Sequence, residues 1–482
     1  MDEKNQLVRA LYEYNPWWSF VKGTDSEAEQ LPSFRREIFD ELYRALTSHS
    51  FSLSIIGPRR VGKSTLIRQL IDQLLKDGVP PTSILRYQLD DPFFVAAKNQ
   101  GSLFEEILKL WEHALGHEIA ASKIPLYCFL DEVQRFPRWE LFIKRIIDLK
   151  RPVCFVVSGS ASTTIFRSSL ESLLGRVKDY HLSTFSFPEL IMWRKQHLRN
   201  GVKYVQSLGD EWLKSHDQKK LYLALVEGVL QKEMKEISLF LGEYFMWGGF
   251  PQVWELRNVV ERQEYLLQNH VEKVIREDLM LVRNIRMPER IEKLFLYLIH
   301  KTGQEVQETR LASECGLSIT AVRDYLELLQ QTELLTLVHK FKMKRGLKRA
   351  AQKIYATDLA LRNASFKYQN IAELTPAELG SYAETVVYHA IRGWPGNVEV
   401  NYYRERNDEV DFVVNTGTEN IPIEVKYRAN PKAHKSLEKF MKIYKCNKKI
   451  IVTKNELSLN DENGISIPLR LFLLLFRTNA LR

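Results

Sequence analysis

Cysteine is scarce in this sequence, with four residues among 482. The four stand far apart, and no two of them form a CxxC pair. This spacing argues against a structural zinc site and against a disulfide framework. Cys128 and Cys154 lie in apolar strand-like runs, where a cysteine usually serves as a small core residue. We therefore expect a protein of a reducing compartment and predict a cytoplasmic location.

Long apolar runs are missing as well. The sequence contains no window of about 18 or more apolar residues, the length that a membrane-spanning helix needs. Its first residues, MDEKNQLVRALYEYNPWW, are too polar for the apolar core of a secretory signal. Internal repeats and low-complexity linkers are also absent from the sequence. We expect no membrane partner.

The length and the charge of the chain narrow the class of protein further. A chain of 482 residues is too long for one ordinary core and indicates about three domains. Hydrophobic residues make up 45% of the sequence, which is ample material for several cores. Lys and Arg number 69 against 60 Asp and Glu, a net charge of +9 that is compatible with a phosphate-rich partner.

Strand-like and helix-like segments alternate over residues 51–190. The apolar runs FSLSII, ILRYQLD, LYCFLDE and VCFVVSG are separated by segments with helical periodicity. Continuous apolar strands joined by helices are typical of a parallel sheet buried on both faces. We expect an α/β domain here, preceded by a helical segment over residues 1–50.

Three further regions follow. Residues 191–290 are mostly helical, with a break at GGFP (248–251). Residues 291–375 contain TRLASECGLSITAVRDYLELLQQ, whose apolar spacing and central turn predict a helix-turn-helix, and then seven Lys or Arg between 340 and 353, typical of a basic wing. Residues 376–482 combine a helix with three strand-like runs and predict a second α/β domain.

The stretch GPRRVGKST begins directly after an apolar strand and opens a helix. Gly57, Gly62, Lys63 and Ser64 fit the pattern GxxxxGK[ST], in which backbone N–H groups and a helix N-terminus surround phosphates. Lys63 would reach the β and γ phosphates of ATP, and Ser64 would ligate Mg²⁺. ATP is favoured over GTP because no guanine-reading NKxD follows. The loop residues expected to bind the nucleotide are Gly57, Pro58, Arg59, Arg60, Val61, Gly62, Lys63, Ser64 and Thr65.

Two acids end the strand LYCFLDE. Asp131 would hold the Mg²⁺ ion, directly or through water, and Glu132 would polarise the attacking water. The alternative is that these two acids are only the exposed end of a strand. The phosphate loop one crossover earlier favours the catalytic role for them. The next strand ends in Ser158 and Ser160, which could contact the γ-phosphate or the water, although SGS is also an ordinary strand-to-turn ending.

Arg176 follows a glycine in LLGRVKDYHL. An arginine finger stabilises charge on a transferring phosphoryl group. Arg176 is the candidate for this role, either within its own chain or presented to a neighbouring subunit. The alternative is a surface arginine that neutralises a helix C-terminus.

The motifs GPRRVGKST, FLDEVQRFPRWELFIKRI, VSGS, LLGR, FSFPEL and GGFP together resemble the prokaryotic AAA-type ATPases whose C-terminal half is the DUF4143 region, relatives of the archaeal ATPase family. The resemblance covers nearly the whole chain. It implies an AAA-like ATPase core, a winged helix and a restriction-endonuclease-like C-terminal domain. The family often has Asn after SGS, whereas this chain has Ala161, so no sensor amide is expected there.

The C-terminal region contains acids in a suggestive arrangement. Glu384 lies on a predicted helix, Asp411 in the strand EVDFVV, and Glu424 and Lys426 in the strand IPIEVKY. Side chains alternate along a strand, so Glu424 and Lys426 share a face, and a hairpin of the two strands would bring Asp411 beside them. Carboxylates bind Mg²⁺, or Mn²⁺, which activates water, and a lysine steadies developing charge.

This arrangement resembles the PD-(D/E)XK nuclease motif, with Val410 in place of its proline. The resemblance implies that Glu384, Asp411 and Glu424 hold a metal and that Lys426 is catalytic. An alternating edge strand with its charged side in water is the alternative.

The winged helix is a candidate for binding duplex DNA. Its second helix offers only Arg323 as an obvious contact and also carries Asp324 and Glu327, so base-specific reading by this helix is not expected. A packing or oligomerisation module is the alternative. The wing residues expected to contact phosphates are Lys340, Lys342, Lys344, Arg345, Lys348 and Arg349.

The sequence thus predicts an ATP-hydrolysing, AAA-like homo-oligomer that acts on DNA and carries a Mg²⁺-dependent nuclease-like domain, for branched or foreign DNA. A rival hypothesis is a nucleotide-dependent switch or scaffold that binds DNA or protein without cutting. A transcriptional repressor is a weaker rival, because the recognition helix is poor in base-reading side chains.

Overall fold

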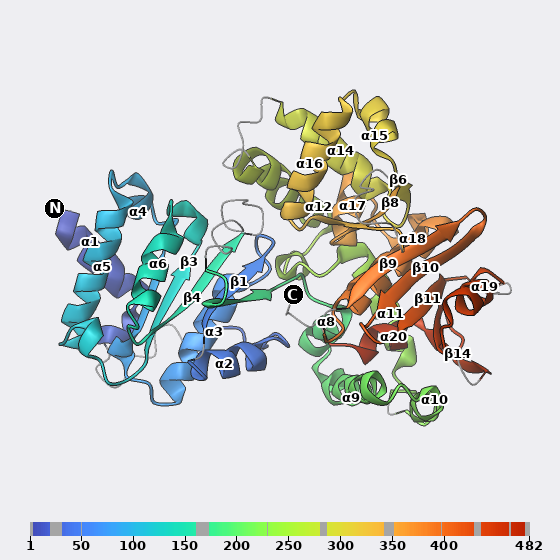
Figure 1. Cartoon of the computed structure of the whole chain (residues 1–482), viewed down its shortest axis with the longest axis horizontal. Coiled ribbons are helices and arrows are strands. Elements are labelled where there is room, and N and C mark those ends of the chain that lie inside the picture. Colours follow the sequence, from blue (N-terminus) through green and yellow to red (C-terminus); the bar gives the residue numbers. More distant parts are fainter. Residues whose placement is uncertain are drawn as a thin grey trace. The chain divides into compact units, whose positions relative to one another are not determined.

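The structure is a computed structural model, and it divides the chain into two compact units (Figure 1). The first unit ends at Ser183 and the second begins at Thr184. The residues that the structure describes are 3–19, 31–49, 51–160, 173–228, 230–279, 287–341, 351–396, 398–428, 435–461 and 464–477.

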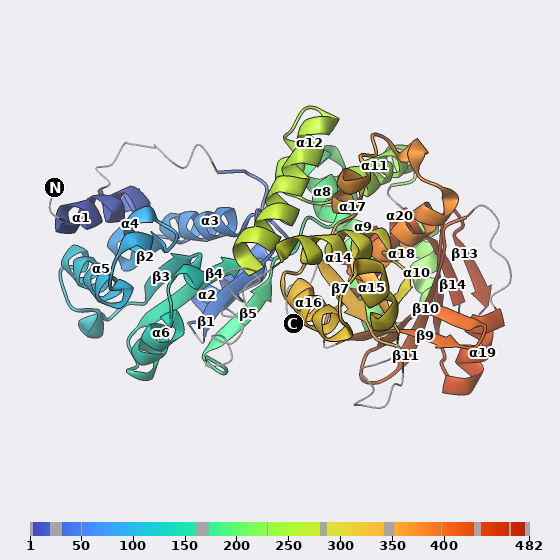
Figure 2. The same ribbon diagram turned by 90° about the horizontal axis from the view of Figure 1, so that it is seen from above.

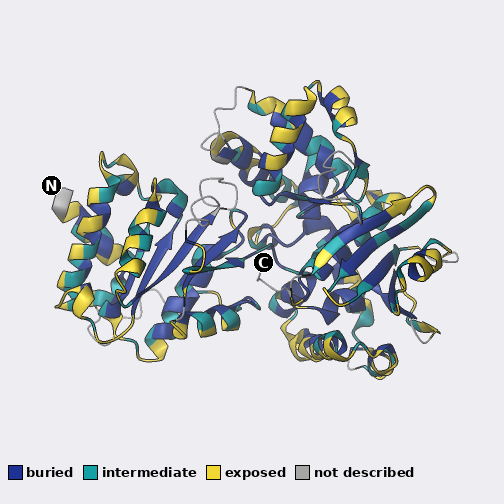
Figure 3. Ribbon diagram, in the orientation of Figure 1, coloured by how far each residue is buried: buried dark blue, intermediate teal, exposed yellow. Residues whose placement is uncertain are grey.

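The first unit is built on a parallel sheet of five strands in the order β2-β3-β4-β1-β5. Its strands are β1 (Ser52–Gly57), β2 (Ile84–Gln88), β3 (Leu126–Asp131), β4 (Val153–Ser160) and β5 (Val177–His181). Its main helices are α1 (Glu3–Tyr14), α2 (Phe39–Thr47), α3 (Lys63–Lys76), α4 (Pro92–Ala96), α5 (Gln100–Leu115) and α6 (Trp139–Asp148). Every residue of β1 and β3 is buried, as a parallel sheet covered by helices requires (Figure 3). This α/β architecture agrees with the prediction for residues 51–190.

The N-terminal segment NPWW completes the edge of this sheet. Asn15 donates to the carbonyl of Arg86 over 2.9 Å and accepts from the N–H of the same residue over 2.6 Å. The indole N–H groups of Trp17 and Trp18 both donate to the carbonyl of Ile84. Since β2 is an edge strand, these side chains occupy backbone groups that would otherwise be open to pairing with another chain.

The second unit begins with a helical region. Its helices are α8 (Phe187–Arg194), α9 (Arg199–Ser215), α10 (Gln218–Val226), α11 (Met234–Trp247), α12 (Val259–Leu266) and α14 (Pro288–His300), with π-helical turns at Leu267–Glu272 and Val274–Asp278. A helix pair and a small sheet follow, formed by β6 (Glu305–Val306), α15 (Glu308–Cys315), α16 (Ile319–Gln331), β7 (Leu335–Val338) and β8 (Gln352–Ala356). The three strands are antiparallel in the order β6-β8-β7, and α17 (Leu359–Phe366) comes directly after them.

A six-stranded sheet forms the C-terminal part of the second unit, in the order β13-β14-β12-β11-β10-β9. Its elements are α18 (Pro376–Arg392), β9 (Glu399–Glu405), β10 (Asp408–Asn415), β11 (Asn420–Lys426), α19 (Lys435–Tyr444), β12 (Lys449–Thr453), β13 (Ser458–Asp461), β14 (Gly464–Pro468) and α20 (Leu469–Leu475). Strands β9, β10 and β11 are antiparallel neighbours, whereas β11, β12 and β14 run parallel. Helix α19 packs on β10 and β11, and α10 lies beside β13 and β14 (Figure 2).

The GGFP turn meets two other segments at a buried carboxylate. Asp358 accepts from the N–H of Gly249 over 2.7 Å and from that of Ala360 over 2.9 Å. Phe185 of FSFPEL donates its N–H to the carbonyl of Gly249. Gly248 has a φ of 62°, and a Cβ there would lie 1.6 Å from Asp358. Two sequence motifs and Asp358 therefore fix how the chain enters the second unit.

No helix in the described part of the chain is long and apolar enough to cross a membrane.

Candidate functional site

The carboxyl edge of the five-stranded sheet gathers the predicted nucleotide-binding residues. In the register of the parallel sheet, Gly57 of β1 lies opposite Ser160 of β4. Asp131 ends β3, the strand on the other side of β4. In open parallel sheets this edge is the place where ligands bind.

The loop at 57–65 leads into α3, with Gly62 at a φ of 100° and Lys63 as the first helical residue. Lys63 is buried, and its ammonium donates to the carbonyls of Gly57 and Pro58, each over 2.9 Å. A Cβ on Gly57 would lie 2.1 Å from the carbonyl oxygen of Leu182, so only glycine fits there. The N-terminus of α3 and its backbone N–H groups thus form an anion-binding end, as in phosphate loops.

Asp131 is fully buried and held by its neighbours. Ser158 of β4 donates its hydroxyl to Oδ1 of Asp131, and the backbone N–H of Glu132 donates to the same oxygen over 3.2 Å. The other oxygen, Oδ2, is buried and has no hydrogen-bond partner among the described residues. A buried carboxylate oxygen without a donor fits a cation ligand, so Asp131 and Ser64 suit a Mg²⁺ ion bound with nucleotide.

Glu132 adopts an unusual backbone conformation directly after Asp131. Its φ of 56° and ψ of 44° place it in the left-handed region, which is strained for a residue with a Cβ and is frequent at functional sites. The amide of Gln134 donates to its carboxylate. Burial raises the pKa of Glu132, and the nearby Lys63 ammonium offsets part of that rise. The carboxylate is therefore oriented beside the phosphate loop.

Arg176 does not reach this edge, which corrects the expectation of an arginine finger within the same chain. It precedes β5, which runs parallel to β1, and its carbonyl accepts from the N–H of Ser52 at the start of β1. Arg176 therefore lies at the amino edge of the sheet, opposite the phosphate loop. Its Nε donates to Asp148 over 2.7 Å. Presentation to a neighbouring subunit remains a proposal.

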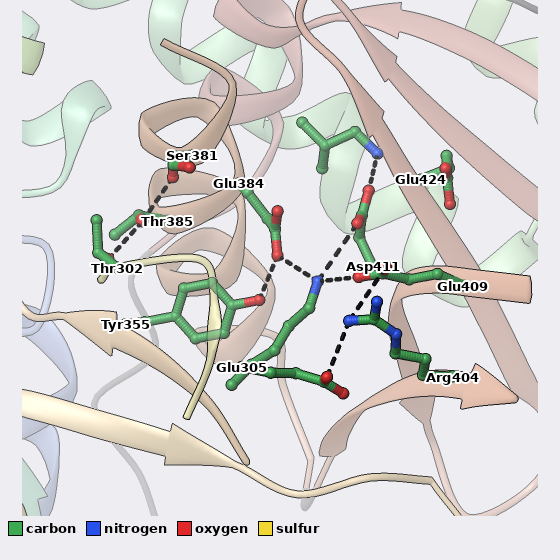
Figure 4. Close-up of polar contacts among 12 residues, drawn as sticks. Thr302, Glu305, Tyr355, Ser381, Glu384, Thr385, Arg404, Glu409, Asp411 and Glu424 are labelled. Carbon is green, nitrogen blue, oxygen red and sulfur yellow. Dashed lines mark hydrogen bonds and ion pairs between the residues drawn. The ribbon is translucent and has the colours of Figure 1, made fainter. Parts of the chain in front are cut away.

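The C-terminal acids form a second cluster around a lysine that the sequence did not assign to them. Lys353 of β8 is 2% exposed, and its Nζ lies 2.8 Å from Oε1 of both Glu384 and Glu409, and 3.5 Å from Oδ1 of Asp411 (Figure 4). Burial alone would lower the pKa of Lys353, but the three carboxylates outweigh this effect and raise that pKa above its usual value. The sequence places Lys353 among the basic residues of the predicted wing, and its burial corrects that interpretation.

A bulge in β10 directs Asp411 into this cluster. Val410 and Val413 both pack in the apolar cluster beneath α19, although strict alternation would place them on opposite faces. The register against β9 shifts between these two residues. Oδ2 of Asp411 accepts from the N–H of Val425 over 2.8 Å, which ties β10 to β11.

Two further residues of the cluster are Tyr355 and Glu424. Tyr355, two residues after Lys353 on the same face of β8, donates its hydroxyl to Oε1 of Glu384 over 2.6 Å (Figure 4). Burial and the charge of Asp411 together raise the pKa of Glu384 to about 7, although the Lys353 ammonium opposes this rise. Glu424 contacts the ammonium of Lys426 through Oε1, whereas its buried Oε2 has no partner among the described residues. Burial and the charge of Asp411 raise the pKa of Glu424 above its usual value.

With the Lys353 ammonium in place, this cluster does not have the form of a metal site. Among the described residues, no three His, Cys, Asp or Glu side chains are placed to share one metal ion. The expected set of Glu384, Asp411 and Glu424 is brought close together, but the Lys353 ammonium takes the place where Glu384 and Asp411 would share a cation.

The predicted DNA contacts lie mostly outside the described residues. Of the six wing residues, Lys340 is described, at an isolated bridge with Tyr402 of β9. Arg323 of α16 donates to Glu308 of α15 over 2.6 Å, so its guanidinium is engaged within the helix pair. The wing residues outside the described ranges are Lys342, Lys344, Arg345, Lys348 and Arg349.

Comparison with known proteins assigns three segments of the chain. Residues 49–191 match an AAA domain, residues 240–371 a domain of unknown function (DUF8612) and residues 379–472 a domain of unknown function (DUF4143). These matches support an AAA-type ATPase of the DUF4143 family. Because the AAA match spans the phosphate loop and the Asp131–Glu132 pair, it supports nucleotide-dependent ATPase activity.

Two curated relatives match this chain over most of its length. An uncharacterized protein of Methanocaldococcus jannaschii is 23% identical over 416 residues, which are 83% of this chain and 82% of that protein. A protein of Haemophilus influenzae is 18% identical over 420 residues, 86% of this chain and 91% of its own. Among solved structures, AMPPCP-bound DnaA from Aquifex aeolicus is 13% identical and covers 67% of this chain and 92% of its own, with a TM-score of 0.23.

Four contributors to these two sites are not predicted from the sequence, and a local signal exists for two of them. Gln134 stands two residues after Glu132 in the same motif, so its proximity to Glu132 in the sequence is the signal. Glu409 lies in the strand already selected for Asp411. Lys353 and Tyr355 come from β8, remote in sequence from Glu384, and no local pattern points to them.

Proposed function

We propose that this protein binds ATP with Mg²⁺ at the phosphate loop and hydrolyses it. The observation that carries the proposal is the grouping of Lys63, Asp131 and Glu132 at one edge of the sheet, with Ser158 fixing Asp131. The Lys63 ammonium, which donates to two loop carbonyls, is the group that would turn to the β and γ phosphates.

The remaining roles follow from chemistry. Ser64 and Asp131 would hold Mg²⁺, which when bound neutralises charge on the phosphates. Glu132, oriented by Gln134, would accept a hydrogen bond from the attacking water and align it. Asp131 is the last residue of β3 and Glu132 follows it directly, so the chain itself places these two carboxylates side by side.

Substitution of the loop lysine tests this site. Lys63→Ala should abolish ATP binding and hydrolysis, because the Lys63 ammonium at the start of α3 is the group that would reach the β and γ phosphates. The matched control is Lys76→Ala at the opposite end of α3, where the ammonium pairs with Asp72 on the surface. A Lys63→Ala variant that hydrolyses ATP at the wild-type rate would remove the basis of the assignment.

We further propose that the ATPase acts on DNA as a homo-oligomer, with Arg176 presented to a neighbouring subunit. The net charge of +9 and the basic composition of the wing support DNA as the partner. Binding to duplex DNA should weaken steeply between about 50 and 200 mM salt if phosphate contacts dominate. A salt-independent affinity, or none at low salt, would favour the alternative of a packing module. That result would favour the rival hypothesis of a nucleotide-dependent switch or scaffold.

A second candidate function is metal-dependent DNA cleavage by the C-terminal sheet. It is favoured by the proximity of Asp411, Glu424 and Lys426 and by the partnerless Oε2 of Glu424. Glu424→Ala with Asp411→Ala should then remove Mg²⁺-dependent or Mn²⁺-dependent cutting of linear or branched DNA while ATP hydrolysis continues. Cutting that persists in the double variant would exclude this site as its source.

A further inference from the structure

The ammonium of Lys353 is the positive charge that balances the carboxylates of the C-terminal cluster. An ammonium has three N–H donors, and Lys353 has three carboxylate acceptors within 3.5 Å, on Glu384, Glu409 and Asp411. Two of these carboxylates, Glu384 and Asp411, are the ones that a metal would have to share. Glu384 also receives the hydroxyl of Tyr355, so one of its oxygens carries two donors from β8.

Hydrogen bonds hold β8 and its neighbours against the C-terminal part of the second unit. The hydroxyl of Tyr402 in β9 donates to the carbonyl of Ala351 over 2.7 Å, and the N–H of Phe341 donates to the carbonyl of Tyr402 over 2.7 Å. At helix α18, the hydroxyl of Thr385 shares a hydrogen bond of 2.9 Å with the hydroxyl of Thr302, which lies shortly before β6 (Figure 4). The position of Lys353 is therefore set by the docking of the small sheet, not by its own flexible side chain.

A divalent cation and this ammonium cannot use the cluster together. Both need the carboxylates of Glu384 and Asp411, and two cations so close together in a buried setting repel each other strongly. Oδ2 of Asp411 is also occupied by the N–H of Val425. With Lys353 in place, Oε2 of Glu424 is the buried carboxylate oxygen of the cluster that has no partner among the described residues, and a single carboxylate is a weak Mg²⁺ site.

We propose that Lys353 is the resident cation of the C-terminal acidic cluster and that it excludes divalent metal for as long as β8 stays docked. The inference concerns regulation of the second candidate function and in that respect rests on it. Metal binding and any cleavage would then require β8 to withdraw its lysine, so the three-stranded sheet acts as the closure of this site.

The test compares Mn²⁺ binding, without nucleotide, by the full-length wild type and by Lys353→Met, with free Mn²⁺ followed by electron paramagnetic resonance. We expect the variant to bind one more Mn²⁺ than the wild type, or to bind it at least about tenfold more tightly, because the competing charge is gone. Adding Asp411→Asn should abolish the gain. The melting temperature of Lys353→Met should fall without metal and recover with Mn²⁺, since removal leaves the buried acids unbalanced.

Lys449→Met is the matched control. Lys449 is also buried and pairs with two acids, Glu438 and Asp461, but these are about half exposed, at 50% and 47% of the side chain. This variant should lose stability without recovering in Mn²⁺. If Lys353→Met does not fold, Lys353→Gln, which keeps a donor without the charge, takes its place.

Equal Mn²⁺ binding by wild type and the Lys353 variant, or no binding by either, would overturn the proposal. ATP hydrolysis measured on the same preparations tests the phosphate loop separately, so failure of one site does not bear on the other.

Discussion

Ser158 donates its hydroxyl to Oδ1 of Asp131, joining the ends of neighbouring strands at the phosphate-binding edge of the first unit. Because this contact orients the carboxylate while leaving Oδ2 without a partner, its loss should act on metal affinity. Ser158→Ala should raise the Mg²⁺ concentration needed for half-maximal ATP hydrolysis by about 10- to 100-fold. The measurement is a Mg²⁺ titration of the hydrolysis rate at saturating ATP.

Ser54→Ala provides the control for that substitution. Ser54 is a buried serine of the same sheet, and it donates to Asp179 over 2.5 Å. Its loss should lower stability and leave the Mg²⁺ dependence unchanged. If both variants shift the Mg²⁺ dependence alike, the effect belongs to the sheet and not to Asp131.

Asn15 is expected to stabilise the first unit through the edge strand. Asn15→Ala leaves the N–H and carbonyl of Arg86 without their side-chain partner, and a buried group left unsatisfied costs about 1–3 kcal/mol. Denaturant unfolding of the full chain, followed by a probe in the first unit, should show this loss. An unchanged midpoint would mean that water or another segment replaces the asparagine.

Gly248 should tolerate no side chain. Its φ of 62° and ψ of −152° are accessible almost only to glycine, and a Cβ would overlap Asp358. Gly248→Ala should therefore cost at least about 3 kcal/mol or prevent folding of the second unit. Gly380→Ala is the control, since that helical position is open and alanine there should add up to about 1 kcal/mol. Similar effects of the two substitutions would contradict the packing described for the GGFP turn.

Acid should destabilise the second unit partly through His389. Burial lowers the pKa of His389 to about 4, below the value of about 6.5 in an unfolded chain, while its Nε2 lies 2.8 Å from the carbonyl of Ala356. The folded state thus keeps the neutral ring, and this stabilisation is present above about pH 6.5 and is lost as the pH falls toward 4.

The comparison that isolates this histidine is between wild type and His389→Gln. All other titrating groups are common to the two proteins and cancel in the difference between their free energies of unfolding. This difference should shrink as the pH is lowered from 7 to 4.5, because only the wild type loses the stabilisation that comes from the neutral His389 ring. A difference that stays constant with pH would show that His389 does not titrate in this range.

Sequence patterns predicted the first unit well because its signals are local. The strand, phosphate loop and helix of residues 51–76 are contiguous, and Asp131 and Glu132 end a single apolar strand. The same reasoning missed that Arg176 lies at the amino edge of the sheet. The position of a residue at one or the other edge depends on strand direction, which LLGRVKDYHL alone does not reveal.

The C-terminal cluster was predicted only in part, because some of its members are placed by tertiary packing and not by local sequence patterns. Glu384, Asp411 and Glu424 were found because each lies in a recognisable helix or strand. Lys353 was missed because basic residues next to a predicted wing are expected in water, and only tertiary packing buries one of them. The bulge between Val410 and Val413 likewise depends on packing under α19 and not on alternation.

The most direct test of the account is the rate of Mg²⁺-dependent ATP hydrolysis by wild type and by Glu132→Gln, with ATP binding measured on both. We predict that both proteins bind ATP and that the variant hydrolyses it at least about 100-fold more slowly, since only the water-aligning carboxylate is lost. Hydrolysis by Glu132→Gln at the wild-type rate would contradict the account.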